Sequence, residues 1–161
     1  MGSVSHRTDA FVLAGHTSWV IMRTPVRSVT NRRSRCAATI LVAEDVEETR
    51  DGIERLLRAD GYRVDPARNE GDAVERARRQ PPDLILVSLS GSNDDVIASA
   101  RRIRQAAQLG DDVPIVIFCL ATVDEGAEVA LGSNVHVTRP DNFDQLRQFL
   151  GRLLSNLSLS R

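Results

Sequence analysis

Between residues 39 and 157 the hydrophobic residues follow two alternating patterns. Short continuous runs of aliphatic and β-branched residues predict strands that are buried on both faces. The stretches between these runs carry apolar residues every three or four positions, which is typical of helices with one buried face. The predicted strands are 39–43, 62–65, 83–88, 115–120 and 135–138. The predicted helices are 46–57, 69–80, 96–107, 124–131 and 143–157.

Five predicted strands therefore alternate with five predicted helices over short connections. Parallel strands need helical crossovers, and strands that are apolar on both faces need helices on both sides of the sheet. The pattern predicts a doubly wound α/β domain of three layers, with the more polar strand 62–65 at an edge. In the first helix we expect these residues to face inward: Val46, Ile53, Leu56 and Leu57.

Composition predicts a single globular domain that does not span a membrane. The chain has 161 residues, of which 42% are hydrophobic, enough for one core. No apolar run in the sequence approaches the roughly 20 residues that cross a bilayer. The two cysteines, Cys36 and Cys119, are too few for a disulfide framework. We therefore expect a reduced, cytoplasmic protein.

The first part of the chain differs in charge from the rest. Residues 1–36 hold six arginines and a single acid, Asp9, whereas the remainder is net acidic. This segment has no hydrophobic periodicity, so we expect a basic, disordered leader that extends to residue 38. A nucleic-acid-binding arm, a transit peptide and a start codon assigned too far upstream are the alternatives. The basic run at 32–35 is too short to indicate a nucleic-acid site, and we do not expect nucleic acid as a partner.

Polar or reactive side chains stand at the ends of four predicted strands. Glu44 and Asp45 follow the first strand, and Ser88 ends the third. Cys119 lies at the end of the fourth strand, and 139–140 follow the fifth. Ligands of doubly wound sheets bind beyond the carboxyl ends of the strands, where the strand order reverses. We therefore expect these residues to meet in one pocket.

Four segments resemble the motifs of response-regulator receiver domains, in the same order and at the same spacing. They are 40–45 (ILVAED), 82–88 (PDLILVS), 114–119 (PIVIFC) and 138–140 (TRP). The resemblance covers about 39–157, which sets the domain boundaries, with 158–161 as a short tail. It implies a flavodoxin-like (βα)5 fold whose five-stranded parallel sheet has the order 2-1-3-4-5.

The resemblance assigns roles to the acidic pair and to the end of the third strand. In the family an acidic pair, matched here by Glu44 and Asp45, holds Mg²⁺ together with a backbone carbonyl, matched by Ser90. The phosphoacceptor aspartate aligns with Ser88. A serine hydroxyl has a pKa far above neutral, and the sequence places no base beside it. Ser88 also removes one of three carboxylates, so we expect only weak Mg²⁺ binding.

Other family positions depart from the usual residues as well. Cys119 stands where a hydroxyl residue hydrogen-bonds the phosphoryl group, and its thiol is a weak donor. Arg139 replaces the lysine before Pro140, and its planar guanidinium is not equivalent to an ammonium group. His136 aligns with the aromatic switch residue.

Simpler roles are open for several of these residues. Glu44 and Asp45 suit the capping of the first helix, because acids are favourable at helix N-termini. Arg139 could neutralise the two acids as a structural cation. Cys119 could be a small buried apolar residue, and Ser88 a substrate of a Ser/Thr kinase.

Together these features predict a degenerate, stand-alone receiver domain of a two-component phosphorelay, acting without phosphorylation and without enzymatic activity. We expect a histidine kinase or another regulatory protein to bind the 124–157 face, formed by 124–131, 135–139 and 142–157. One alternative is a phosphate-accepting receiver with unconventional chemistry. The other is a flavodoxin-like small-ligand binder, although four acids in 44–48 would repel phosphate.

Overall fold

The computed structural model describes residues 37–118 and 122–159. Within these residues the chain forms six strands and four helices. The strands are β1 (Thr39–Glu44), β2 (Arg63–Ala67), β3 (Leu84–Ser88), β4 (Ile115–Phe118), β5 (Glu128–Gly132) and β6 (Val135–Thr138). The helices are α1 (Glu47–Ala59), α2 (Glu70–Arg79), α3 (Asn93–Ala106) and α4 (Phe143–Leu159).

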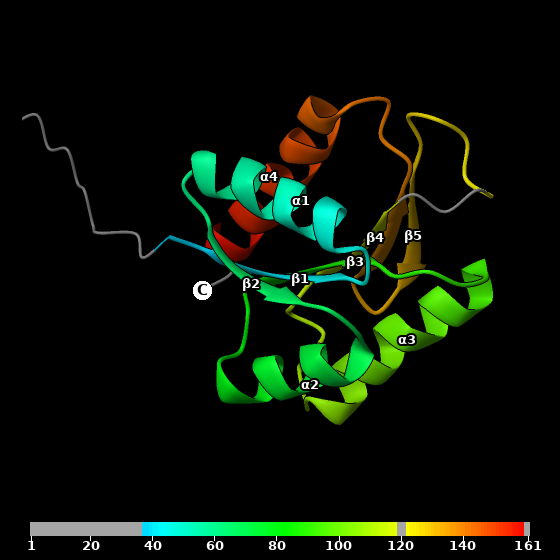
Figure 1. Ribbon diagram of the computed structural model, residues 1–161. Helices are drawn as coiled ribbons and strands as arrows, with labels where there is room; N and C mark the ends of the chain where they lie inside the picture. The colour runs from blue at the N-terminus through cyan, green and yellow to red at the C-terminus, as the bar shows by residue number, and fades with distance from the viewer. Residues whose placement is uncertain (1–36, 119–121, 160–161) are drawn as a thin grey trace, which may run out of the picture. The chain divides into compact units, whose positions relative to one another are not determined.

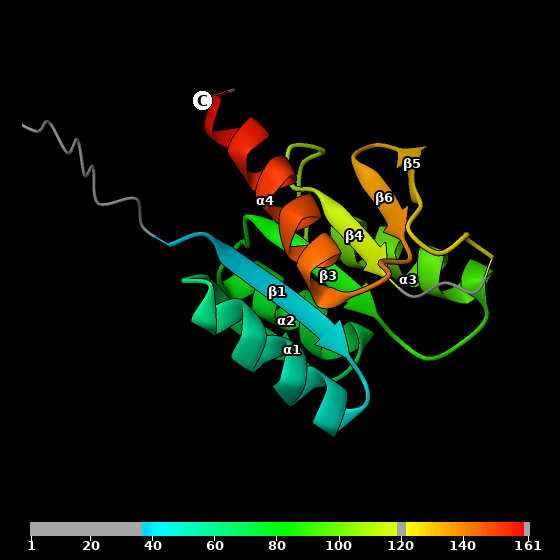
Figure 2. The same cartoon turned by 90° about the horizontal axis from the view of Figure 1, so that it is seen from above.

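The six strands form one sheet in the order β2-β1-β3-β4-β6-β5. The first five in this order are parallel to their neighbours, and β5 runs antiparallel to β6. Helices α1 and α4 cover one face of the sheet, while α2 and α3 cover the other (Figures 1 and 2). The predicted three-layer α/β architecture is confirmed, as is the edge position of the second strand.

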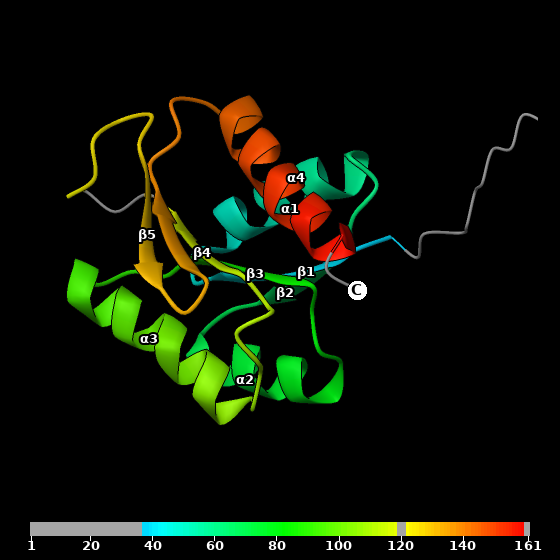
Figure 3. The same cartoon turned by 180° about the vertical axis from the view of Figure 1, so that it is seen from behind.

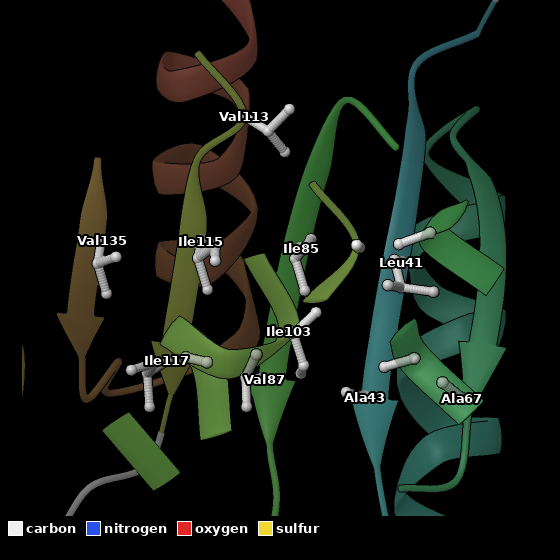
Figure 4. Packing of buried hydrophobic residues seen from close by; sticks show 14 of the residues in the cluster. Leu41, Ala43, Ala67, Ile85, Val87, Ile103, Val113, Ile115, Ile117 and Val135 are labelled. Carbon is white, nitrogen blue, oxygen red and sulfur yellow. The ribbon is translucent and has the colours of Figure 1, made fainter. Parts of the chain in front are cut away.

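Alternate residues of the central strands supply two apolar clusters, one on each face of the sheet. Leu41, Ile85 and Ile115 belong to the cluster beneath α2 and α3, and all three are at most 1% exposed. Figure 4 shows these side chains on neighbouring strands with Ile103 of α3 among them. The other cluster, around Ile40 and Leu150, lies beneath α1 and α4. Burial on both faces explains why the strands read as continuous apolar runs.

The predicted helix at 124–131 is wrong. Residues 128–132 form β5, which pairs with β6 through a tight turn. In this turn φ is positive at Gly132 (88°), Ser133 (48°) and Asn134 (55°). Small and amide residues adopt such angles most readily, and turns of this type join antiparallel strands. The sheet therefore has six strands in the order 2-1-3-4-6-5, and not five in the order 2-1-3-4-5.

A buried arginine holds this hairpin against α3. Arg104, only 9% exposed, donates from Nη1 to the carbonyl of Ser133 and, at 3.1 Å, to Asp111. Its Nη2 donates to the carbonyls of Val113 and Asn134. One guanidinium thus joins the end of α3, the start of β4 and the β5–β6 turn.

The inward face of the first helix is narrower than predicted. Ile53 and Leu57 are buried, but Val46 and Leu56 are 50% and 46% exposed. Val46 precedes the first residue of α1 and so lies outside the helical repeat. The predicted apolar face of the third helix is confirmed, because Val96, Ala100, Ile103 and Ala107 are all buried.

Three parts of the sequence-based account are not tested by the fold. The expected leader and the 158–161 tail fall wholly or partly outside the described residues, as does the end of the predicted strand 115–120. Across the described ranges, no helix is both long and apolar enough to cross a membrane.

Candidate functional site

The carboxyl end of β1 presents two acids that differ in their surroundings. Glu44 is the last residue of β1 and only 3% exposed, whereas Asp45 is exposed. Glu44 accepts a hydrogen bond at Oε1 from the N–H of Val46 at 2.9 Å. Its backbone carbonyl also accepts from Arg50, at 3.1 Å. The chain turn that leads into α1 is therefore fixed around Glu44.

The carboxyl end of β3 supplies a serine partner for each acid. Parallel pairing of β1 with β3 sets Ser88 opposite Glu44, and the Ser88 hydroxyl lies near enough to favour the ionised form of the Glu44 carboxylate. The N–H of Ser90 lies 3.1 and 3.3 Å from the two carboxylate oxygens of Asp45. The Ser90 hydroxyl also favours the ionised form of Asp45. We call these four residues the acidic corner: Glu44, Asp45, Ser88 and Ser90.

Protonation of the acidic corner is set by burial and by these hydrogen bonds. Burial raises the pKa of Glu44, and the charge of Asp45 raises it further. The N–H of Val46 and the hydroxyl of Ser88 favour the ionised form, but they offset this rise only in part. For Asp45, desolvation is outweighed by the hydroxyl and N–H of Ser90, and the pKa is lowered. On acidification Glu44 therefore takes up a proton before Asp45.

The Ser88–Glu44 contact corrects one expectation. A carboxylate does lie beside the serine hydroxyl, although nothing adjacent in sequence supplies a base. The parallel register of β1 and β3 creates this neighbour across 44 residues of chain. The structure places a carboxylate base beside the Ser88 hydroxyl. Whether Ser88 can act as a nucleophile therefore depends on the charges around it as well as on the presence of a base.

The acidic corner is poorly suited to a tightly held divalent cation. Mg²⁺ favours carboxylate oxygens in near-octahedral geometry and is rarely bound tightly by few charges. Only two carboxylates are present, and that of Glu44 is buried and already accepts a hydrogen bond from the N–H of Val46. Among the described residues no group of three His, Cys, Asp or Glu side chains is arranged to hold a metal ion. The donor set does not fit a resident metal.

Arg139 does not neutralise the acids in this structure. Its Nη1 lies 3.5 Å from the carbonyl of Val123, and its backbone pairs with Gly126 and Ala127. In the described part of the chain neither Glu44 nor Asp45 forms an ion pair with a basic side chain. Pro140 follows Arg139 in the connection to α4.

The first-helix capping role also finds no support in the structure. The N-cap residue of α1 is Val46, and no side chain caps the helix there. Glu44 instead accepts from the N–H of Val46 and faces Ser88, and Asp45 accepts from the N–H of Ser90.

His136 does not belong to the acidic corner. His136 lies within β6 and packs edge-on against Phe149 of α4, with ring centroids 5.8 Å apart. Its Nε2 is 2.9 Å from Oδ1 of Asn134. Burial, helped by the charge of Arg104, lowers the pKa of His136, although Glu128 opposes this. Cys119 lies outside the described residues, so its predicted position is untested.

Sequence reasoning did not identify Arg104, whose guanidinium orders the hairpin beside β6. The only signal is its position, next to Ile103 within an otherwise apolar helix face. Sequence reasoning assigned Thr138 no role beyond its place in the 138–140 segment. In the structure it is 1% exposed, and its Oγ1 donates to the carbonyl of Ala127 at 3.1 Å.

Comparison with known proteins agrees with this fold. Residues 40–150 match the response regulator receiver domain. The chemotaxis protein CheY4 of Vibrio cholerae is 16% identical, with a TM-score of 0.53, over 73% of this chain and 98% of that chain. The N-terminal domain of a response regulator/sensory box/GGDEF protein from Carboxydothermus hydrogenoformans is 22% identical, with a TM-score of 0.57, over 76% and 98%.

The response regulator TrrA of Thermotoga maritima, solved in complex with Mg²⁺ and BeF, is 21% identical, with a TM-score of 0.56, over 72% and 98% of the two chains. At these identities the solved structures establish a shared fold. The family match itself covers most of the chain. The chain therefore belongs to the response regulator receiver domain family.

Proposed function

We propose that this domain serves two-component signal transduction as a receiver that is not phosphorylated at the end of β3 and that acts through protein contacts. The observation that carries the proposal is the Ser88–Glu44 pair. Where the family has its phosphoacceptor aspartate, this chain has a hydroxyl that faces a buried carboxylate across the strand pair. A hydroxyl cannot form an acyl phosphate.

The charges around Ser88 also disfavour transfer of a phosphoryl group to its oxygen. Phosphoryl transfer is promoted mainly by cations that neutralise the transferring group. Here Ser88 faces Glu44, which lies beside Asp45, and Arg139 is directed to the carbonyl of Val123. An incoming phosphoryl dianion would meet two acids without a paired cation among the described residues.

The protein contacts are assigned to β5, β6 and α4. This surface corresponds to the 124–157 face, with a hairpin in the place of the expected helix. Its partner is a histidine kinase or another regulatory protein of the same pathway. The domain itself has no enzymatic role in this proposal, and Mg²⁺ binds only weakly.

A phosphate mimic tests independence from phosphorylation. Amide spectra of the ¹⁵N-labelled protein are recorded with and without Mg²⁺ and beryllofluoride. We expect no saturable shifts at Ser88, Ser90 or Arg139 in the wild type. Saturable shifts that spread from Ser88 into β6 would contradict the proposal.

Two variants at position 88 serve as matched controls for this experiment. Ser88→Asp restores the carboxylate. Ser88→Asn introduces a side chain of the same shape as aspartate but without its charge. Shifts in Ser88→Asp alone would show that the assay detects a competent site. The absence of shifts in the wild type would then be due to the missing carboxylate charge at position 88.

One observation favours a second candidate function. Because the Glu44 carboxylate lies beside the Ser88 hydroxyl, it could remove the hydroxyl proton and allow a phosphoserine to form. A phosphoserine ester resists hydroxylamine, whereas an acyl phosphate does not. Incubation with a phosphodonor followed by hydroxylamine therefore separates this alternative from conventional receiver chemistry.

A further inference from the structure

We infer that two copies of this chain associate by pairing the β5 edges of their sheets. β5 is the last strand of the sheet and, among the described residues, pairs only with β6 (Figure 3). An unpaired edge presents free N–H and C=O groups that can bind another strand. The inference is independent of the chemistry at position 88.

The register of the hairpin shows which backbone groups of β5 point outward. The N–H of Arg139 donates to the carbonyl of Ala127 at 3.2 Å, so the hydrogen-bonded pair Ala127–Arg139 lies directly next to the facing pair Glu128–Thr138. Glu128 and Thr138 are therefore a non-hydrogen-bonded pair of an antiparallel ladder, and so is the pair two residues on, Ala130–His136. The N–H and C=O groups of Glu128 and Ala130 consequently face away from β6.

A two-fold axis through Val129 makes this short edge complementary to itself. Around such an axis Glu128 pairs with Ala130 of the second copy, and both outward-facing residues form hydrogen bonds. Val129 then lies directly opposite Val129 of the second copy. Val129 is 43% exposed and is one of few large apolar side chains so exposed in the described ranges. Facing β-branched side chains are a favourable cross-strand pair.

Charge does not oppose this pairing. Glu128 lies opposite an alanine and not opposite its own copy. Its carboxylate is also bound by Arg152 of α4, whose Nη2 is 2.6 and 2.7 Å from the two oxygens. The guanidinium of Arg152 rests 5.4 Å from the ring centroid of Phe149, which fixes its position. The acid most able to block the edge is therefore neutralised within its own chain.

The hairpin is held firmly enough to present this edge without much loss of entropy. Arg104 holds the turn, and Thr138 bonds to the carbonyl of Ala127. Nε2 of Gln145 donates to the carbonyl of Gly126 at 3.0 Å. Preorganised edges lose less conformational freedom on binding. The irregularity between Ala130 and Gly132 ends the regular pairing, so the interface is short and the dimer reversible.

Sedimentation equilibrium of the full chain over a wide concentration range tests the inference. We expect the average mass to rise from the 17.7 kDa monomer towards the dimer with increasing concentration. Val129→Asp places two carboxylates across the axis and should leave the protein monomeric. Leu56→Asp, at a comparably exposed apolar residue of α1, should associate as the wild type does.

A second variant tests the backbone pairing and does not depend on an introduced charge. Ala130→Pro removes an N–H that faces away from β6, so the bond pattern within the hairpin is kept. We expect it to weaken dimerisation about tenfold or more, because two symmetry-related hydrogen bonds are lost. Thermal unfolding of each variant checks that the fold is retained. A wild type that stays monomeric throughout, or a Val129→Asp variant that still dimerises, would overturn the inference.

Discussion

Replacement of Arg104 by methionine should destabilise the domain by removing the clamp on the β5–β6 hairpin. Methionine preserves most of the apolar length of the side chain but none of its donors. The guanidinium now reaches four acceptors: the carbonyls of Val113, Ser133 and Asn134 and the carboxylate of Asp111. Its Nε is buried and has no hydrogen-bond partner in the described structure.

The expected loss follows from where these acceptors lie. The turn carbonyls of Ser133 and Asn134 are near the surface and can bind water after the substitution. The carbonyl of Val113 lies at a buried residue and stays unsatisfied, which costs about 1–3 kcal/mol. Each lost bond from a charged donor adds to this, but the arginine no longer has to be desolvated. We expect the free energy of unfolding to fall by roughly 2–4 kcal/mol.

Asp111→Asn is the matched control, because it removes only the ion pair. The Asp111 side chain is 70% exposed, so the pair is screened and its loss should cost below about 1 kcal/mol. Urea unfolding at neutral pH measures both values, and hydrogen exchange of the β6 amides shows whether the hairpin loosens. Equal losses for the two variants, or a loss below 1 kcal/mol for Arg104→Met, would refute the reasoning.

Three further predictions concern the acidic corner and the start of the chain. Burial raises the pKa of Glu44 in the folded state above its value of 4.5 in the unfolded chain. Ionised Glu44 therefore lowers the free energy of unfolding at pH values above the folded pKa, and this destabilisation disappears once the pH has fallen to 4.5. Glu44→Gln should therefore be more stable than the wild type at pH 7 and equal to it in acid, and urea titrations at several pH values measure the difference. Ser88→Asp should bind Mg²⁺ measurably more tightly than the wild type by calorimetry, since it restores a third carboxylate; equal affinities would contradict the account of the acidic corner. A chain that starts at Ala37 should unfold with a midpoint within a few degrees of the full chain, and a collapsed transition would place part of the core before residue 37.

Strand positions and helix faces were largely predictable, because buried parallel strands and amphipathic helices leave strong periodic signals. The run from Ile40 to Ala43 and the spacing of Leu146, Leu150 and Leu154 led directly to β1 and α4. The assignment of 124–131 failed because Glu, Ala and Leu favour helices locally. The alternation of Val129 and Leu131, followed by the Gly132–Asn134 turn, is the pattern of a hairpin. The prediction of a crossover helix did not take this pattern into account.

The candidate site was predictable only in part, for a geometric reason. Strand ends identify Glu44, Asp45 and Ser88 as neighbours, because parallel strands bring their carboxyl ends to one edge. Hydrogen-bond partners depend on register and on rotamers, which the sequence does not specify. The Ser88–Glu44 contact and the direction of the Arg139 side chain therefore emerge only from the structure.

Intact-mass analysis after incubation with acetyl phosphate and Mg²⁺ tests the central claim most directly. The Ser88→Asp variant is treated in parallel, and hydroxylamine is added to a portion of each sample to cleave acyl phosphates. For the wild type the account predicts no added phosphoryl group, because Ser88 has no carboxylate and no cation pairs with the acids around it. A phosphoryl adduct on the wild-type chain that hydroxylamine removes would contradict it.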